Sequence, residues 1–204
     1  MNRSKLSVLI PAAGASTRLG QVKQLVLFKR DSLISNAVNT AYSVAPREII
    51  VVTGAHSKVV RNAVQHPSVR WINNPLWSTG LGGSVAVGSA AISPESTGLM
   101  ILLCDQWCIN SQDIEKLVNT WHSAPERIVV AQANGRYMPP VIFPSIFFTD
   151  LQELKGDQGA RSLFKTHLDL ISAVPMKNAA FDLDTPAHLE LLKRSELDTS
   201  PYHC

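Results

Sequence analysis

The first candidate for chemistry in this chain is a loop of small residues that follows an apolar run. Residues 11–20 read PAAGASTRLG, and two cations, Arg18 and Lys23, lie within and just after this stretch. Small side chains let the backbone approach a ligand closely, successive amide groups can surround a phosphate, and the two cations can neutralise its charge. We therefore expect an anion site here in preference to an ordinary surface turn.

The spacing of this loop separates it from two other phosphate-binding loops. Five residues lie between Gly14 and Gly20, and Gln21 follows, whereas a P-loop needs four residues between its glycines and then a lysine. A dinucleotide-binding fingerprint needs a glycine at position 12, where this chain has Ala12. The sequence therefore disfavours both P-loop chemistry and a nicotinamide-dependent dehydrogenase.

A carboxylate follows the most apolar run of the chain. Asp105 comes directly after residues 99–104, which read LMILLC. Mg²⁺ prefers one or two carboxylates together with phosphate oxygens and water, and an aspartate at the end of a buried strand supplies the first of these ligands. The alternative is a helix-capping aspartate, but Asn110 or Ser111 fits the cap position better. Asp105 is therefore the first candidate metal ligand.

Residues 74–88, NPLWSTGLGGSVAVG, resemble the start of a helix made of small side chains. Gly80 and the glycines after it leave backbone amides uncovered at that start, and Ser84 can bond a base or a ribose. Trp77 is open to two interpretations, in which it packs the loop or contacts the nucleotide.

Alternating strands and helices must position these loops. Short, nearly continuous apolar runs predict buried strands, and they lie at 8–11, 49–53, 69–72, 99–104, 128–131 and 171–174. Helical periodicity follows several of them, at 34–45 after a cap at Asp31 or Ser32, at 59–64 and at 114–121. This alternation predicts a three-layer α/β/α fold with a mainly parallel sheet and a ligand site at the carboxyl ends of the strands.

Composition limits the remaining classes. The chain has 204 residues, 45% of them hydrophobic, so we expect one domain over 1–194 and a C-terminal tail over 195–204. Its net charge of +3 is dispersed along the chain, so we expect no nucleic-acid partner. The run 6–13 is too short to span a membrane and lacks the layout of a signal peptide, which predicts a cytoplasmic protein without a membrane partner. Cys104, in an apolar run, is expected in the core.

The sequence of the first loop, together with Lys23 and the residues after it, resembles the corresponding loop of nucleotidyltransferases, which wraps the triphosphate. Ala12 and Ala13 resemble the cytidylyltransferases more than the guanylyltransferase relative, and an isoprenoid-pathway cytidylyltransferase fits equally well at this point. Further motifs at 74–84, 105–106, 155–161 and 181–186 occur in the order of the molybdenum cofactor cytidylyltransferase family. The resemblance runs from about Leu9 to Leu192, and it implies a Rossmann-like nucleotidyltransferase fold and transfer of CMP from CTP to molybdenum-bearing molybdopterin, with Mg²⁺ as cofactor.

The resemblance also assigns roles to residues. It implies that Lys23, Arg18 and Asp105 are catalytic, and that Asp105 binds metal together with Asp182 or Asp184. Asp182 is favoured because Asp184 also fits a charge at the start of the last helix. The expected nucleotide site comprises Ala12, Ala13, Gly14, Ala15, Ser16, Arg18, Lys23, Thr53, Asn74, Gly80 and Ser84.

The acceptor side is expected at residues 155–161, where Arg161 would hold the terminal phosphate of molybdopterin near Asp157. The alternative is an Arg161–Asp157 pair that braces a turn. The chain departs from the family pattern at Trp107, where a proline is usual, and at 138–140, which read MPP.

A molybdenum hydroxylase apoenzyme of the xanthine dehydrogenase type is the implied partner. Three alternatives stay open: another phosphorylated acceptor, GTP as the donor, and a noncatalytic protein that delivers molybdopterin.

Overall fold

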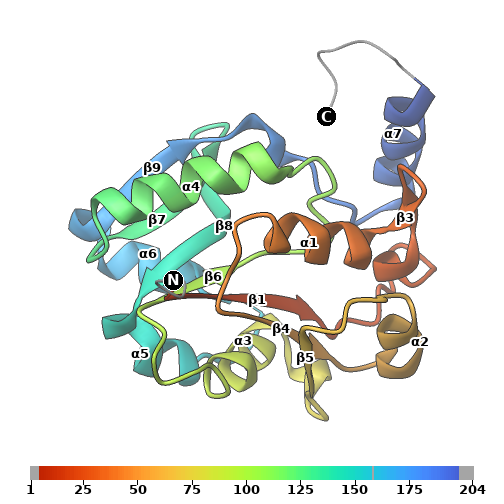
Figure 1. Ribbon diagram of the computed structural model, residues 1–204. Coiled ribbons are helices and arrows are strands. Elements are labelled where there is room, and N and C mark those ends of the chain that lie inside the picture. The colour runs from red at the N-terminus through yellow and green to blue at the C-terminus, as the bar shows by residue number, and fades with distance from the viewer. Residues whose placement is uncertain (1–4, 158, 198–204) are drawn as a thin grey trace.

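A computed structural model describes residues 5–157 and 159–197 of the chain. Its main sheet has the strand order β5-β4-β1-β6-β8-β7-β9 (Figure 1). These strands are β1 (Leu6–Ala12), β4 (Glu48–Thr53), β5 (Val69–Asn73), β6 (Gly98–Ile101), β7 (Ile128–Ala133), β8 (Arg136–Pro144) and β9 (Ile171–Pro175). Neighbouring strands pair in parallel except around β8, which is antiparallel to both β6 and β7. The expected mainly parallel sheet is confirmed.

Helices cover both faces of this sheet (Figure 1). They are α1 (Leu33–Tyr42), α2 (Ser57–Asn62), α3 (Leu81–Ser89), α4 (Ser111–Ser123), α5 (Phe148–Gln152), α6 (Arg161–Thr166) and α7 (Pro186–Leu197). Alternate residues of β1 point to opposite faces, so Val8 and Ile10 pack with α1 and α4 while Leu9 packs with α3, α5 and α6. The three layers expected from the sequence are therefore present.

Local signals account for where two helices begin. The hydroxyl of Ser32 accepts a hydrogen bond from the amide of Ser35 at the start of α1. Asn110 and Asp113 form a reciprocal capping box at the start of α4. Of the caps considered from the sequence, Ser32 and Asn110 are the residues used.

Strand β8 is the one strand of the main sheet that the sequence did not predict. Pro139 and Pro140 lie within it, and a proline has no amide to donate to a neighbouring strand. The pairing of β7 with β8 shifts register between Val130 and Ala131, opposite these prolines, and ordinary pairing resumes at Val141. The antiparallel strand therefore tolerates its prolines at an irregularity, which a search for continuous apolar runs does not find.

A small two-stranded sheet, β2 (Leu27–Phe28) and β3 (Asp31–Ser32), contacts α7 near the carboxyl ends of the strands. Helix α7 continues to Leu197, three residues into the segment expected as a tail from 195, and residues 198–204 lie outside the described part of the chain. Among the described residues no helix is both long and apolar enough to cross a membrane.

Candidate active site

Two pockets at the carboxyl ends of the strands share one wall. The first, of about 670 Å³, is lined by the loop after β1, by residues around the start of α3 and by Asp157. The second, of about 820 Å³, is lined by Arg136, Arg161 and residues that follow β6. Leu103, Asp105 and Asp184 line both pockets. A molecule in each pocket would therefore meet the other beside two carboxylates.

Lys23 joins these two carboxylates. Its Nζ donates to Oδ2 of Asp105 at 2.6 Å and to Oδ1 of Asp184 at 2.8 Å. Arg18 donates to the other oxygen of Asp184 at 3.2 Å from a largely exposed position, whereas Lys23 and Asp105 are mostly buried. The structure thus brings together the three residues expected to be catalytic. It adds Asp184, one of the two candidates for the second metal ligand.

The charges in this cluster shift one another's protonation. Burial lowers the pKa of Lys23, but attraction to Asp105 and the hydrogen bonds to both carboxylates outweigh it, so the pKa lies above its ordinary value. Burial raises the pKa of Asp184, but the hydrogen bond from Lys23 and the nearby charges of Lys23 and Arg18 bring it below its ordinary value. Lys23 is therefore a fixed cation at neutral pH and is unsuited to act as a general base.

A single backbone contact brings the two carboxylates together. Asp105 follows β6, and Asp184 precedes α7. The amide of Leu183, a fully buried residue, donates to the carbonyl of Asp105 at 3.0 Å. The amide of Asp184 donates to Nδ1 of His188 in the first turn of α7, at 3.3 Å. The position of Asp184 is thus set by its neighbours on both sides.

Asp182 lies apart from this cluster. Its side chain is half exposed, and its Oδ1 is 4.0 Å from Nδ1 of His188. It lines the second pocket, whereas Asp184 lines both. The sequence preference for Asp182 as the partner of Asp105 is therefore not supported by the geometry, which favours Asp184.

One oxygen of Asp105 has no hydrogen-bond donor among the described residues. Oδ1 of this carboxylate is buried, while Oδ2 accepts from Lys23. A buried carboxylate oxygen without a donor is costly unless a ligand compensates it, and a divalent cation would do so. No group of three or more His, Cys, Asp or Glu side chains among residues 5–157 and 159–197 forms a closed metal site, so such a cation would need further oxygens from substrate or water.

Gln24 shapes the first loop and was not singled out from the sequence. This nearly fully buried residue donates from Nε2 to the carbonyls of Ala12 and Gly14, at 3.2 and 3.1 Å. The hydroxyl of Ser16 accepts from the amide of Lys23 at 3.1 Å and closes the other side of the loop. In the sequence, the only indication of this role is that Gln24 is a polar residue in the segment KQL whose presence no amphipathic pattern explains.

Two residues expected to bind nucleotide are buried and form hydrogen bonds within the protein. Thr53 is fully buried, and its hydroxyl bonds the hydroxyl of Ser57 and the carbonyl of Ile72. Asn74 is 2% exposed and donates to Oγ of Ser84 at 3.1 Å. Neither side chain lines the first pocket, and their contact with a nucleotide stays a prediction.

The other expected nucleotide-binding residues divide by position. Ala12 and Ala15 do not line the first pocket, and the carbonyl of Ala12 is held by Gln24. The expected residues that do line it are Ala13, Gly14, Ser16, Arg18, Lys23, Gly80 and Ser84. Trp77 lines it as well and also packs closely against Gly54, so both interpretations of this residue stay predictions.

The glycines at the start of α3 serve a close packing contact. A Cβ on Gly82 would stand 2.7 Å from the carbonyl oxygen of Lys155, and a Cβ on Gly80 would stand 2.5 Å from Gly156. The amide of Gly82 donates to the carbonyl of Gly156 at 2.8 Å. This amide, expected to be uncovered, is therefore satisfied by the chain segment 155–157.

This packing separates two residues expected on the acceptor side. Asp157 lines the first pocket, beside Gly80, whereas Arg161 lines the second. Within the described residues no ion pair joins Asp157 to Arg161, so the alternative of a braced turn is not observed. Arg136, from β8, lines the second pocket with Arg161 and was missed because β8 itself was missed.

The departure at Trp107 has a structural explanation. The indole is 8% exposed, and its ring lies 5.4 Å from that of Phe28 and 5.7 Å from that of Phe181. Aromatic packing therefore holds the chain after Asp105 in place. Cys104 is buried as expected, and burial raises the pKa of its thiol to about 12, which leaves it unreactive.

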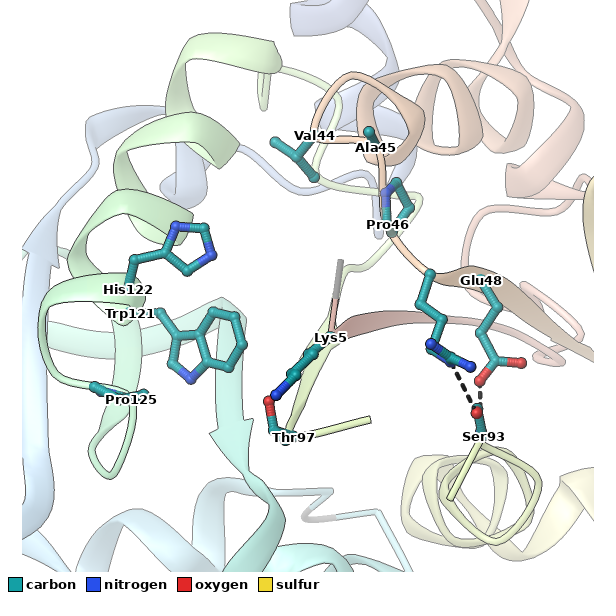
Figure 2. A pocket seen from close by; sticks show the side chains of 11 residues that line it. Lys5, Val44, Ala45, Pro46, Glu48, Ser93, Thr97, Trp121, His122 and Pro125 are labelled. Atoms are coloured by element: carbon teal, nitrogen blue, oxygen red, sulfur yellow. Dashed lines mark hydrogen bonds between the residues drawn. The ribbon is translucent and has the colours of Figure 1, made fainter. Parts of the chain in front are cut away.

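A further hollow, of about 880 Å³, lies at the opposite end of the sheet. Figure 2 shows Glu48 beside Ser93 in this hollow, and Oε1 of Glu48 accepts from the amide of Ser93 at 2.5 Å. Arg47 donates to Oγ of Ser93 at 2.9 Å and to Glu95. These charges brace the connection between α1 and β4, and ligands of open α/β sheets bind at the other edge.

Comparisons with known proteins identify relatives of this chain. The family model of the MobA-like NTP transferase domain matches residues 8–171. The purine catabolism protein PucB of Bacillus subtilis is 31% identical over 90% of this chain and 94% of its own length. Nicotine blue oxidoreductase of Paenarthrobacter nicotinovorans is 26% identical over 85% of this chain and 89% of its own length.

Among solved structures, Rv0371c of Mycobacterium tuberculosis superposes with a TM-score of 0.83 at 22% identity, covering 94% of this chain and all of that one. The same protein is also known as a complex with manganese, with a TM-score of 0.78 and 21% identity over 93% of this chain and 98% of that one. At this level of identity the likeness establishes the fold.

Proposed function

Because the chain belongs to the family of MobA-like NTP transferase domains, we propose that it is a molybdenum cofactor cytidylyltransferase. It would transfer CMP from CTP to molybdenum-bearing molybdopterin and release pyrophosphate. The observation that carries this proposal is the wall shared by the two pockets, where Lys23 holds Asp105 and Asp184 together. Two anionic substrates that react with each other need this arrangement of separate pockets and a common centre.

In this proposal the donor nucleotide occupies the first pocket. Gly14 and Ser16 offer loop amides to the triphosphate, and Arg18 and Lys23 supply positive charge. Ser84 lies at 3% exposure in the wall formed by α3, and its hydroxyl accepts from Asn74, which leaves its own hydrogen free to donate to the base.

The acceptor occupies the second pocket. Arg136 and Arg161 line it, and neither forms an ion pair with another described residue. Two unpaired guanidinium groups opposite a carboxylate pair suit a phosphate that must approach those carboxylates. We assign Arg161, and with it Arg136, to the acceptor phosphate.

A divalent cation, which we propose to be Mg²⁺, fits at Asp105 and Asp184. The buried Oδ1 of Asp105 lacks a donor among the described residues, and the two carboxylates supply the hard oxygen ligands that Mg²⁺ prefers. The manganese complex of Rv0371c supports a divalent ion in a protein of this fold. When bound, the ion would neutralise charge on the phosphates.

The residues of this chain then act by position and charge. A phosphate oxygen of the acceptor forms a bond to the α-phosphorus of CTP, and the bond from the α-phosphorus to the β-phosphate oxygen breaks, so that pyrophosphate leaves. A phosphate nucleophile is already ionised, and the raised pKa of Lys23 keeps this residue a cation, so its role is to neutralise charge. Catalysis rests on orientation and electrostatic stabilisation, without a covalent enzyme intermediate.

The names of the relatives bear on the partner. PucB is named for purine catabolism, and xanthine is a purine, which supports a partner apoenzyme of the xanthine dehydrogenase type. We propose no nicotinamide-dependent oxidoreductase activity for this chain, because Ala12 breaks the dinucleotide fingerprint.

A second candidate is a nucleotidyltransferase with another phosphorylated acceptor or with GTP as donor. The observation that favours it is the place of Met138 and Pro139, which line the second pocket where the sequence departs from the family pattern. A noncatalytic molybdopterin carrier is a weaker candidate, because such a protein needs no donor pocket beside a paired carboxylate centre.

Pyrophosphate release tests the proposal. The purified protein, with Mg²⁺ and molybdopterin that carries molybdenum, is assayed with CTP, GTP, ATP and UTP in parallel. The proposal predicts release with CTP that depends on the acceptor. Preference for GTP would change the donor, activity only with another phosphorylated acceptor would change the substrate, and tight molybdopterin binding without nucleotide consumption would favour the carrier.

A further inference from the structure

Asp157 is a third carboxylate in the first pocket, and among the described residues it differs from Asp105 and Asp184 in having no cation paired with it. Its side chain is exposed at the edge of the first pocket, on the segment that packs against the start of α3. Its Oδ1 lies 2.5 Å from the position that a Cβ on Gly80 would take. The hydrogen bond from Gly82 to Gly156 fixes this segment to the pocket wall.

The charge of Asp157 is not neutralised within the described part of the chain, since no salt bridge or hydrogen bond there involves its carboxylate. A free carboxylate repels a triphosphate, and a hydrogen bond from a neutral donor of the same ligand can offset this repulsion. A nucleotide has two kinds of such donors, the ribose hydroxyls and the amino or imino groups of its base.

Position along the pocket favours the ribose. The cations Arg18 and Lys23 mark the phosphate end, and Ser84, one turn into α3 and almost fully buried, marks the deep wall suited to the base. Asp157 stands at the rim near Gly80, at the start of α3. The ribose joins base to phosphates, so a rim carboxylate beside the deep wall faces the sugar. Carboxylates accept ribose hydroxyls in other nucleotide-binding folds.

We propose that Asp157 accepts hydrogen bonds from the ribose hydroxyls of the donor nucleotide and thereby selects ribonucleotides over deoxyribonucleotides. This inference rests on the proposed function in one respect, because it takes the first pocket as the nucleotide site. It reassigns the residue from the acceptor to the donor.

Calorimetric titration of the full chain with nucleotide and Mg²⁺, without acceptor, tests this assignment. The ligands are CTP, 2′-deoxy-CTP and 3′-deoxy-CTP, or the same series of whichever nucleoside triphosphate the wild type binds best. Because a hydrogen bond to a charged group is strong, the wild type should bind the ribonucleotide roughly tenfold or more tightly than at least one deoxy analogue. In Asp157→Ala this ratio should fall to about one, through weaker binding of the ribonucleotide.

An increase in affinity in Asp157→Ala would identify simple charge repulsion. If Asp157 only repels the triphosphate, Asp157→Ala will tighten the ribonucleotide and both deoxy analogues equally, and the proposal is overturned. An unchanged ratio in the variant overturns it as well. Glu153→Ala removes the same charge from a nearby exposed position outside the pocket and should leave the ratio unchanged. Thermal unfolding of each variant verifies the fold.

The result also separates this inference from the proposed function. Binding of a ribonucleoside triphosphate without dependence on Asp157 leaves the donor site standing and removes the ribose contact. A folded wild type that binds none of the four ribonucleoside triphosphates contradicts the donor site and the ribose contact together.

Discussion

The ammonium of Lys23 lies 2.6 Å from Oδ2 of Asp105, at the wall that two pockets share. The same ammonium holds Asp184, so it stands between the two carboxylates that we assign to a divalent cation. A cation and Lys23 therefore compete for the charge of the same two carboxylates. Nucleotide phosphates offer the lysine an alternative partner, which would couple metal binding to donor binding.

Replacing Lys23 tests this competition. In the absence of nucleotide, Lys23→Met should bind Mn²⁺ about tenfold more tightly than the wild type, because two buried carboxylates lose their cation. The same variant should lose turnover. Lys116→Met, at an exposed position on α4, is the matched control and should change neither quantity. Equal Mn²⁺ affinity in wild type and Lys23→Met, measured by titration calorimetry, would refute the competition.

Asp105 is the carboxylate on which the proposed centre depends most. Asp105→Asn retains the side-chain size but removes the charge, so it should lower the rate of pyrophosphate release at least about 100-fold. Circular dichroism and thermal unfolding should show a folded protein, because the backbone contact of Asp105 with Leu183 is kept. Activity close to that of the wild type would remove Asp105 from the centre.

The cluster also sets a pH dependence of stability. The pKa of Asp184 lies below its ordinary value of 3.8, so its contribution is present above that pH and is lost as pH falls through the lowered pKa. The pKa of Lys23 lies above its ordinary value of 10.5, so its contribution is present below that pH and is lost as pH rises through the raised pKa.

The difference in unfolding free energy between wild type and Asp184→Asn should therefore be flat between about pH 5 and pH 9 and should shrink below about pH 4. Urea denaturation at a series of pH values measures it. A difference that grows on acidification would show that the carboxylate of Asp184 is not stabilised by Lys23.

Two glycines should respond differently to substitution. Gly82→Ala places a Cβ 2.7 Å from the carbonyl oxygen of Lys155, and should destabilise the protein by about 1–3 kcal/mol. Gly14→Ala meets no atom within 4 Å and should leave stability nearly unchanged while weakening nucleotide binding, because the loop amides approach the phosphates. Equal unfolding free energies for the two variants would contradict the packing of segment 155–157 on α3.

The sequence predicted the site where local rules decide position. A carboxylate at the end of a buried run must lie at the ligand-binding edge of a parallel sheet, and this placed Asp105. The small-residue loop and Lys23 follow the first strand by the same rule. Ser32 and Asn110 were each one of two predicted caps, because a polar side chain before a helical pattern satisfies free amides.

What the sequence did not predict depends on contacts between distant segments. Asp184, in preference to Asp182, faces Asp105 because the amide of Leu183 bonds the carbonyl of Asp105, which no local pattern indicates. Asp157 lies in the first pocket because Gly80 and Gly82 let a segment some 75 positions later pack against them. Thr53 was expected in the nucleotide site, and its hydroxyl bonds the carbonyl of Ile72 inside the sheet.

The most direct test of the central claim follows the α-phosphate of the donor. CTP labelled at the α-phosphate is incubated with the protein, Mg²⁺ and molybdopterin that carries molybdenum, and the products are separated. Nucleotidyl transfer predicts that the label appears in a molybdopterin dinucleotide, with one pyrophosphate released for each product molecule. Label that remains in CTP, or that appears only as free CMP, with protein shown to be folded and acceptor shown to be intact, would contradict the account.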